Sequence, residues 1–373
     1  MNRRAFLLLT DGLRFNLMDR KEVQRLKVEL KGQKLEILAR DLHEPCTSRA
    51  WLEQALFLPP GFVGRLHAQG LVSRDANRLH VESKIYPDDR IVIDLSAFAP
   101  PTTLQQLDLK RVSTQSPGAE ILFEDPHLLA VQKPAGILIH SERPEEDTLD
   151  RRVSIQLGSP FVYHVHRLDR GTSGIVLYAK HALMLRSLDH QLAKHKIRRL
   201  YVALVEGNLS PLNGTLNDSI GKDRHHAGRY RVSKGGQPAV TEYHTLFSPL
   251  FYGQQKVSLL ACQLKTGRTH QIRVHLSSRG CPVVGDVLYG ALQPRLSSAR
   301  QVNHHSAIES TKEAFFLHAH ALSFVHPYTG KAHLLTAHWP QAWQPVLELV
   351  GDHRLDRKLH HLYKELNGAE VQA

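Results

Sequence analysis

The sequence predicts an α+β protein in which a large domain is built on a mixed, largely antiparallel sheet and comes after a small N-terminal α/β module. From residue 120 onward, apolar runs typical of strands outnumber helical stretches and do not alternate regularly with them. A stretch rich in Pro, Thr, Gln and Ser at 99–119 separates this part from the first 98 residues and predicts a linker. The 373 residues, 42% of them hydrophobic, can bury a core in each part.

The N-terminal module, residues 1–98, begins with a short apolar run at 5–9. That run is too short for a signal sequence or a membrane span, so we expect a tail or a short strand. Helices are expected at 49–58 and 62–69, the second ending at Gly70, and strands at 71–75, 79–83 and 90–95. This order resembles the small RNA-binding module named after a ribosomal small-subunit protein. A small domain of another use is the alternative.

The large domain, residues 120–345, contains one clear helical stretch at 183–195 and a Ser-rich, basic stretch at 294–313 that we expect to be a mobile insertion. Residues 346–373 predict a charged, helical C-terminal tail. The tail holds a second copy of the sequence HRLDR, at 353–357, without a subsequent Gly-Thr-Ser-Gly turn, and we interpret it as a chance match. Strands are expected at 121–125, 127–134, 136–140, 174–180, 200–207, 241–247, 257–264, 271–276 and 321–327.

The formal charge of +12 and a pI near 9.6 favour a polyanionic partner such as nucleic acid, although a solvated basic surface would give the same numbers. The three cysteines, Cys46, Cys262 and Cys281, form no CxxC pair. Their spacing argues against a disulfide framework and against a structural zinc site, and it fits a reducing cytoplasm.

The segment with most chemical content is HRLDRGTSG at 166–174, where Asp169 lies between Arg167 and Arg170. Neighbouring guanidinium groups keep a carboxylate ionised and oriented, and an ionised carboxylate can act as a nucleophile or as a base. The alternative is a structural aspartate that pairs with an adjacent arginine in a turn.

A second polar segment, GRTHQIRVH, occupies 267–275. If it is extended, Gln271 and Arg273 share one strand face with Thr269 and suit a phosphate or a partner carboxylate. An exposed polar strand face is the alternative. Lys133, at the end of an expected strand, and Tyr201, at the start of another, complete the candidate residues, and a packed core aromatic is the alternative for Tyr201.

Taken together, HRLDRGTSG, GRTHQIRVH with VVGDVLYG after it, and LHAHALSFVHPYTGK resemble the RluA-type family of RNA pseudouridine synthases, in the same order and at similar spacing. The resemblance spans about 121–340. It implies the pseudouridine synthase fold and an isomerase that converts specific uridines of ribosomal or transfer RNA to pseudouridine by base flipping. The N1–C1′ bond breaks, and the base is turned and rejoined through C5.

By the same resemblance, Asp169 is the nucleophile, Arg273 is its ion-pair partner, and Tyr201 stacks on the base and helps to remove the C5 proton. Arg167 fills the gap left by the flipped base. The reaction needs no cofactor and no metal. We expect a monomer that binds RNA and no membrane, and its candidate RNA contacts are Arg167, Arg170, Arg268, His270, Gln271 and Lys133.

Two other classes of function compete with this interpretation. A catalytically inactive RNA-binding protein would share the charge and the fold, but the intact Asp169, Tyr201 and Arg273 speak against it. A metallohydrolase could use the histidine pairs at 164/166 and 318/320, although acidic ligands are not evident at a characteristic spacing.

Overall fold

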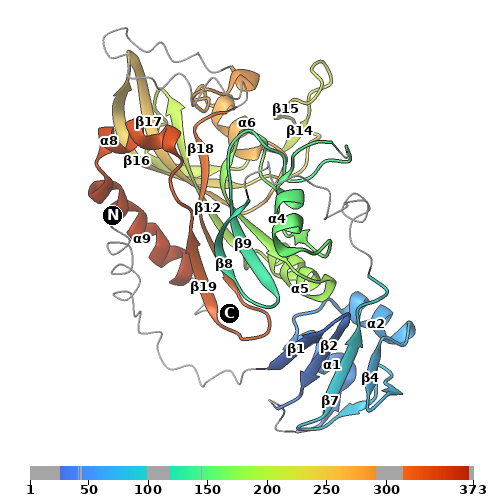
Figure 1. Cartoon of the computed structure of the whole chain (residues 1–373). Coiled ribbons are helices and arrows are strands. Elements are labelled where there is room, and N and C mark those ends of the chain that lie inside the picture. Colours follow the sequence, from blue (N-terminus) through green and yellow to red (C-terminus); the bar gives the residue numbers. More distant parts are fainter. Residues whose placement is uncertain are drawn as a thin grey trace.

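The computed structural model describes residues 26–40, 42, 44–98, 118–143, 145–290 and 314–368. A small N-terminal module lies at one end of a large sheet domain (Figure 1). The apolar run at 5–9, most of the expected linker and the expected insertion at 294–313 lie outside the described residues.

The N-terminal module combines two helices, α1 (Ser48–Ala55) and α2 (Pro60–Ala68), with an antiparallel sheet in the order β1-β2-β7-β4-β5. Helix α1 begins after Thr47, whose Oγ1 accepts a hydrogen bond from the Ala50 amide at 3.2 Å. Both expected helices are confirmed. The strand expected at 79–83 is wrong, because His80 and Ser83 close a turn on each other. The strands are β1 (Lys27–Lys31), β2 (Lys34–Leu38), β3 (Cys46–Thr47), β4 (Val72–Arg74), β5 (Asn77–Arg78), β6 (Lys84–Ile85) and β7 (Arg90–Asp94).

The large domain is built on one mixed sheet in the order β13-β16-β17-β12-β18-β11-β9-β8, with β10 paired to β11 and β19 paired to β18. Every pairing in it is antiparallel except that between β11 and β18, so the predicted fold class is confirmed. The strands are β8 (Glu120–Glu124), β9 (Leu128–Lys133), β10 (Tyr163–His164), β11 (Ser173–Ala179), β12 (Arg198–Glu206), β13 (Asn213–Leu216), β16 (Thr241–Tyr252), β17 (Gln255–Leu264), β18 (Leu317–Val325) and β19 (Ala332–Thr336).

Two expected strands of this domain are wrong. Residues 136–140 form a loop in which only Leu138 makes an isolated bridge, to Thr148. Residues 271–276 are helical. A small hairpin, β14 (Ile220–Lys222) and β15 (Tyr230–Val232), stands beside the sheet. The helices are α4 (Leu149–Leu157), α5 (Ala182–Ala193), α6 (Gln271–Ser278), α8 (Gln344–Val350) and α9 (Asp352–Gly368), with short 3₁₀ turns at Val287–Tyr289 and Gln341–Trp343.

The central strand β12 sends alternate side chains to two different cores. Tyr201 and Ala203 face the side that also carries α4 and α6, whereas Leu200 and Val202 face α8 and α9. The C-terminal segment is therefore part of the domain core and not a charged tail. Its helix α9 buries four leucines spaced by four, three and four residues, Leu355, Leu359, Leu362 and Leu366.

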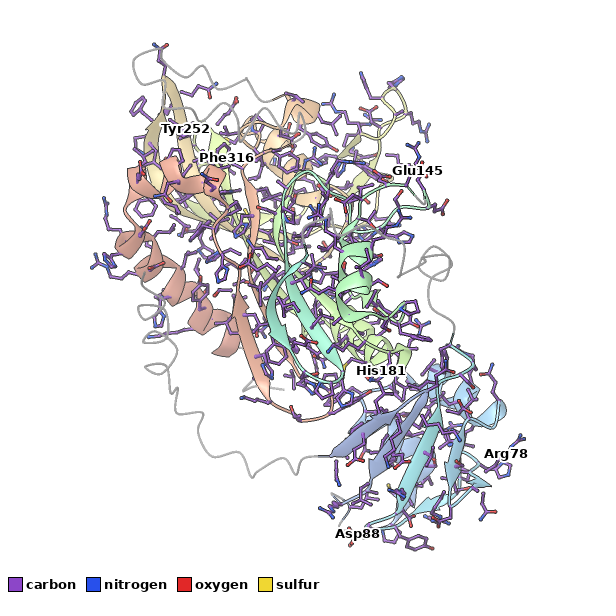
Figure 2. The ribbon with its side chains drawn as sticks, viewed as in Figure 1. Arg78, Asp88, Glu145, His181, Tyr252 and Phe316 are labelled. Atoms are coloured by element: carbon purple, nitrogen blue, oxygen red, sulfur yellow. The ribbon has the colours of Figure 1, made fainter. Side chains whose placement is uncertain are left out.

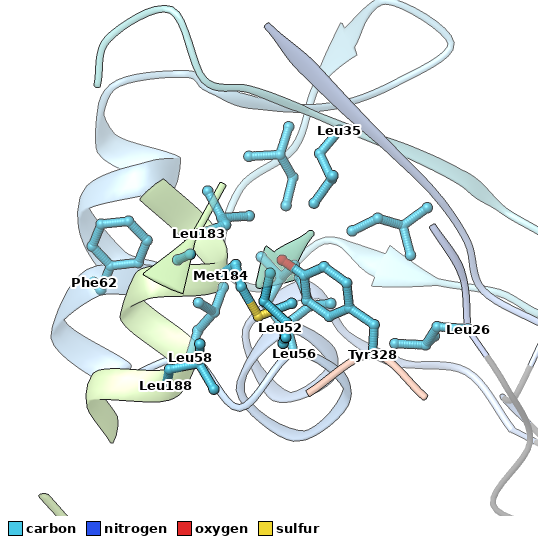
Figure 3. Close-up of a cluster of buried hydrophobic side chains, with 14 of the residues drawn as sticks. Leu26, Leu35, Leu52, Leu56, Leu58, Phe62, Leu183, Met184, Leu188 and Tyr328 are labelled. Carbon is cyan, nitrogen blue, oxygen red and sulfur yellow. The ribbon is translucent and has the colours of Figure 1, made fainter. Parts of the chain in front are cut away.

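The N-terminal module shares a hydrophobic cluster with α5 and the neighbouring strands of the large domain (Figure 3). Leu56 and Leu58 of the module lie against Leu183 and Leu188 of α5. The Ser187 hydroxyl donates to the Leu56 carbonyl at 2.5 Å across the same contact. Because this contact is apolar and buried, it fixes the module against the sheet domain.

Candidate active site

Asp169 lies in the loop that leads from β10 into β11, at the edge of the core that contains Tyr201. The Thr172 amide donates to the Asp169 carbonyl at 3.1 Å, which closes a tight turn behind the carboxylate. Gly174 comes next, where β11 runs parallel to β18. A Cβ at Gly174 would lie 2.2 Å from the Ala319 carbonyl oxygen, so only glycine permits this close approach.

Lys133 supports the same loop. Its side chain is fully buried, and its Nζ donates to the carbonyls of Pro134, Arg170 and Thr172 at 2.9, 2.9 and 2.8 Å. Burial lowers the pKa of Lys133 to about 7, against the attraction of the Asp169 charge. The expectation that Lys133 contacts RNA is therefore corrected, because its amino group faces the backbone of the loop that carries Asp169.

Arg273 reaches Asp169 from the first turn of α6. Its Nη1 donates to Asp169 Oδ2 at 2.9 Å, while its Nε and Nη2 donate to the two oxygens of Asp286 at 2.6 and 2.9 Å. The guanidinium carbon lies 4.9 Å from the Tyr289 ring centroid and 4.4 Å from that of Phe315. Arg273 is thus clamped by a bidentate pair and two aromatic rings while it holds the carboxylate of Asp169.

Burial and ion pairing have opposite effects on the pKa of Arg273, and the pairings together have the larger effect. Burial alone would lower the pKa of Arg273, but its hydrogen bonds and ion pairs with Asp286 and Asp169 raise it above the ordinary value. Asp286 is 1% exposed, whereas the side chain of Asp169 is 23% exposed. The buried aspartate therefore anchors the arginine, and the accessible one is left to meet a substrate.

The helical form of 271–278 is what makes this geometry, and it replaces the strand we expected. His270 adopts a left-handed conformation with φ of 56° and ends the preceding turn, so α6 begins at Gln271. Gln271 is buried, and its amide group bonds Val240, Thr241 and Thr266. Its expected role as an RNA contact is corrected, because it fastens α6 to β16.

Tyr201 lies on β12 beside a β-bulge in the pairing with β18 and is 4% exposed. Burial raises the pKa of its hydroxyl; the positive charge of Arg199 acts against this and the negative charge of Asp169 adds to it. Tyr201 is therefore a neutral phenol at neutral pH, within the electrostatic reach of Asp169.

His270 occupies the other side of Asp169, with its Nε2 3.9 Å from Asp169 Oδ1. Its Nδ1 lies 2.8 Å from the Tyr289 hydroxyl, which also accepts a hydrogen bond from the Tyr230 amide at 3.0 Å. The hairpin β14–β15 is in this way tied to the site, and Arg229 lies over the Tyr289 ring.

The remaining predicted RNA contacts are more accessible. Arg167 is exposed next to Asp169, and Arg268 is exposed with its Nε donating to the Pro238 carbonyl at 3.0 Å. Arg170 pairs with Glu146 at 2.7 Å. Side chains throughout this part of the sheet domain are drawn in Figure 2.

Sequence reasoning missed Asp286 and Tyr289, the two residues that position Arg273 and His270. Both lie in VVGDVLYG, whose glycines by themselves indicate only a return loop. Asp286 stands in a largely apolar stretch, and this is a signal that its carboxylate is buried and paired. Its partner, Arg273, is identified only by the tertiary contact.

The histidine pairs considered as metal ligands each bind groups of the protein instead. His318 contacts the Ser173 hydroxyl at 2.9 Å, His320 the Tyr363 hydroxyl at 2.6 Å, and His164 the Asp150 carboxylate at 3.2 Å. Within the described ranges, no group of three His, Cys, Asp or Glu residues is arranged to hold a metal. The three cysteines are free thiols.

The helices that the structure describes are all too short or too polar to cross a membrane.

Comparison with known proteins identifies the region that carries this site. Residues 127–278 match a family model described as RNA pseudouridylate synthase. The RNA pseudouridine synthase YhcT of Bacillus subtilis is 39% identical over 257 residues, which cover 68% of this chain and 76% of that protein. The tRNA pseudouridine synthase C of Yersinia pestis is 35% identical over 62% of this chain and 91% of its own length. The ribosomal large subunit pseudouridine synthase D of Nitrosomonas europaea is 36% identical over 62% of this chain and 65% of its own length.

Proposed function

Because the chain belongs to the RluA-type family of RNA pseudouridine synthases, we propose that it isomerises specific uridines of transfer or ribosomal RNA with Asp169 as its nucleophile. The observation that carries the assignment is the chain of charges from Asp286 through Arg273 to Asp169, which holds one carboxylate at an accessible position. Relatives named for tRNA and for large-subunit rRNA support both classes of target.

The proposed reaction rearranges one nucleotide and consumes nothing. The carboxylate of Asp169 forms a bond to the nucleotide, and the N1–C1′ bond breaks with its electron pair remaining on the uracil. The uracil turns, a C5–C1′ bond forms, and the bond to Asp169 breaks again, which regenerates the carboxylate. The proton on C5 is then removed and N1 takes up a proton, so the formula of the RNA is unchanged. Arg273 keeps Asp169 ionised and oriented, and Tyr201 packs on the base while its phenol stays protonated.

The target uridine must leave its stack to reach Asp169, which costs a few kcal/mol. Arg167, exposed on the same loop, is suited to fill the gap, because a planar guanidinium can replace stacking. Arg170, Arg268 and His270 are the proposed contacts to the surrounding RNA. The N-terminal module is proposed to add RNA contacts, and its docking on α5 supports a fixed spacing between those contacts and Asp169.

The experiment is pseudouridine mapping of total RNA from a strain that lacks the gene, complemented with the wild type or with Asp169→Asn. We expect one or more pseudouridines to disappear and to return only with the wild type. Complementation by the Asn variant would contradict the assignment, and an unchanged map in the deletion strain would contradict the function. We further propose a cytoplasmic monomer, tested by fractionation and by light scattering on the purified chain.

A further inference from the structure

A basic hollow of about 520 Å³ lies between α9 and the strands β13 and β16. Helix α9 contributes Arg354, Arg357 and Lys358 to its wall, and the strands contribute Asn213 and Thr245. Two of these cations belong to the second HRLDR sequence, which the active site does not use. The hollow is large enough for a nucleotide unit and carries one sign of charge.

The aromatic ring of Phe247 orders two of these cations. The guanidinium carbon of Arg354 lies 5.4 Å from the ring centroid and the Nζ of Lys358 lies 5.1 Å from it. Phe247 is itself buried in the core between the sheet and α9. Arg354 and Lys358 therefore lie over a buried aromatic support.

No carboxylate within the described residues forms an ion pair with these three cations. His361, which also lines the hollow, pairs with Glu365 at 3.5 Å, and among the described residues no ion pair joins Arg354, Arg357 or Lys358 to an acid. The Nε of Arg357 donates only to the His353 carbonyl of its own helix, at 3.4 Å. Three like charges in one concave surface repel one another unless an anion lies between them.

The hollow and the catalytic site lie on opposite faces of the same sheet. Leu246 and Phe247 of β16 face α9, whereas Thr241 of the same strand accepts a hydrogen bond from Gln271 of α6 on the catalytic face. Strand β13 is the edge of the sheet between the two faces. A strand of RNA that passes around this edge can contact both.

We propose that the hollow beside α9 binds the phosphates of the substrate RNA at a second place, remote from Asp169. The proposal rests on the RNA substrate inferred above and deepens it. The phosphodiester backbone of RNA supplies several anions at a regular spacing, which matches a row of cations along one helix face. A free nucleotide shares this chemistry, so the test must distinguish the two sources.

The test compares the triple variant Arg354→Gln, Arg357→Gln, Lys358→Gln with a control that removes three exposed lysines outside α9, Lys194→Gln, Lys196→Gln, Lys331→Gln. Both variants lose the same net charge. Affinity for a long poly(U) strand and for a uridine octamer is measured by fluorescence anisotropy at several salt concentrations. We expect the triple variant to bind poly(U) at least about 10-fold more weakly at low salt, with a log–log salt slope reduced by about 2, which is three contacts at about 0.7 each.

The control should show a markedly smaller change, and the octamer, which offers fewer phosphates than poly(U), should separate the variants less than poly(U) does. Equal loss in triple variant and control would overturn the proposal, since net charge alone would then explain it. Titration with UMP provides the other arm. If the triple variant loses UMP binding but keeps poly(U) binding, the hollow is a nucleotide site and the RNA proposal is wrong.

The rate of pseudouridine formation distinguishes a failure of this proposal from a failure of the proposed function. With RNA from the deletion strain as substrate, the triple variant should form pseudouridine at the wild-type rate once the RNA is saturating. If the wild type forms none, the proposed function fails whatever the binding data show. If the triple variant is slow at saturation, the hollow affects the chemistry and is not a remote contact.

Discussion

The five residues HRLDR occur twice in this chain, and the two copies have different structures. At 166–170 they form a loop between β10 and β11, whereas at 353–357 they form the first turns of α9. In the loop, Asp169 is 23% exposed and paired with Arg273 from a distant helix. On the helix, the side chain of Asp356 is exposed, and partial desolvation together with the nearby charge of Asp352 raises its pKa.

The residues on the C-terminal side of each copy explain the difference. Gly-Thr-Ser-Gly after the first copy permits the turn at Thr172 and the close crossing of β11 and β18 at Gly174. After the second copy, leucines at helical spacing continue the helix and bury one face of it. The same side chains thus present a carboxylate in one context and a row of cations in the other.

The largest effect that this comparison predicts is on the two aspartates. Asp169→Asn should lower the single-turnover rate by on the order of 10³-fold or more while RNA affinity changes little, because an amide cannot act as the nucleophile. Asp356→Asn, in the second copy, should react at the wild-type rate. Pseudouridine formed per enzyme is the measurement. Activity of the Asp169 variant above a few per cent would break the distinction between the copies.

Arg273 and Arg357 form the next matched pair. Arg273→Lys should lower the single-turnover rate by about 10²-fold with nearly normal RNA binding, because lysine cannot donate to Asp169 and to both oxygens of Asp286. Arg357→Lys should leave both the rate and the affinity unchanged, since a phosphate needs only a point charge. Weakened binding by Arg273→Lys with a normal rate at saturation would make Arg273 a phosphate clamp.

The sequence predicted the fold class and the Arg273–Asp169 pair, but not how α6 presents that pair. GRTHQIRVH alternates polar and apolar residues and contains β-branched Ile272 and Val274, so its local pattern favours a strand. Its helix is only eight residues long and has no side-chain cap. Contacts with β16 and Asp286 stabilise that helix, and they are tertiary contacts that a local pattern does not contain.

The role of Lys133 was unpredictable for a related reason. A lysine at the end of a strand is normally solvated. Two of the three carbonyls that accept from Lys133 belong to residues 37 and 39 positions away in the sequence, so no local pattern indicates them. The C-terminal helix, by contrast, was readable. The spacing of Leu355, Leu359, Leu362 and Leu366 indicates a buried face, and only the density of charge around it suggested a solvated tail.

The third prediction concerns how the first copy is held in place. Lys133→Met keeps the volume but removes three donors from the loop carbonyls, so the single-turnover rate should fall by about 10-fold as the position of Asp169 loosens. Lys34→Met, at an exposed position of β2 in the N-terminal sheet, is the control and should have no effect. A normal rate for Lys133→Met would show that the loop holds its form without the amino group.

The difference in stability between the wild type and Lys133→Met should depend on pH in a defined direction. The folded pKa is about 7 and the ordinary value is 10.5, so between these values the unfolded chain binds the extra proton. The stability of the wild type relative to Lys133→Met should therefore rise as pH increases through this window, and the cost of burying the charge is fully present below pH 7. Urea denaturation of both proteins at several pH values measures this, and an opposite slope would contradict the burial of a charged amine.

The smallest expected effect on the rate concerns Arg170 and Arg357, the last residues of the two HRLDR copies. Arg170 pairs with Glu146 at 2.7 Å, but its side chain is 38% exposed, so solvent screens the pair and its contribution to the position of the loop should be small. Arg170→Gln should therefore lower the single-turnover rate no more than about 5-fold, by loosening the loop that carries Asp169. Arg357→Gln should not change that rate, because Arg357 lies on α9, remote from the carboxylate of Asp169. A double-mutant cycle of Arg170→Gln with Glu146→Gln measures the coupling, and a large value would mean that this surface pair positions the nucleophile as strongly as the buried contact from Arg273 does.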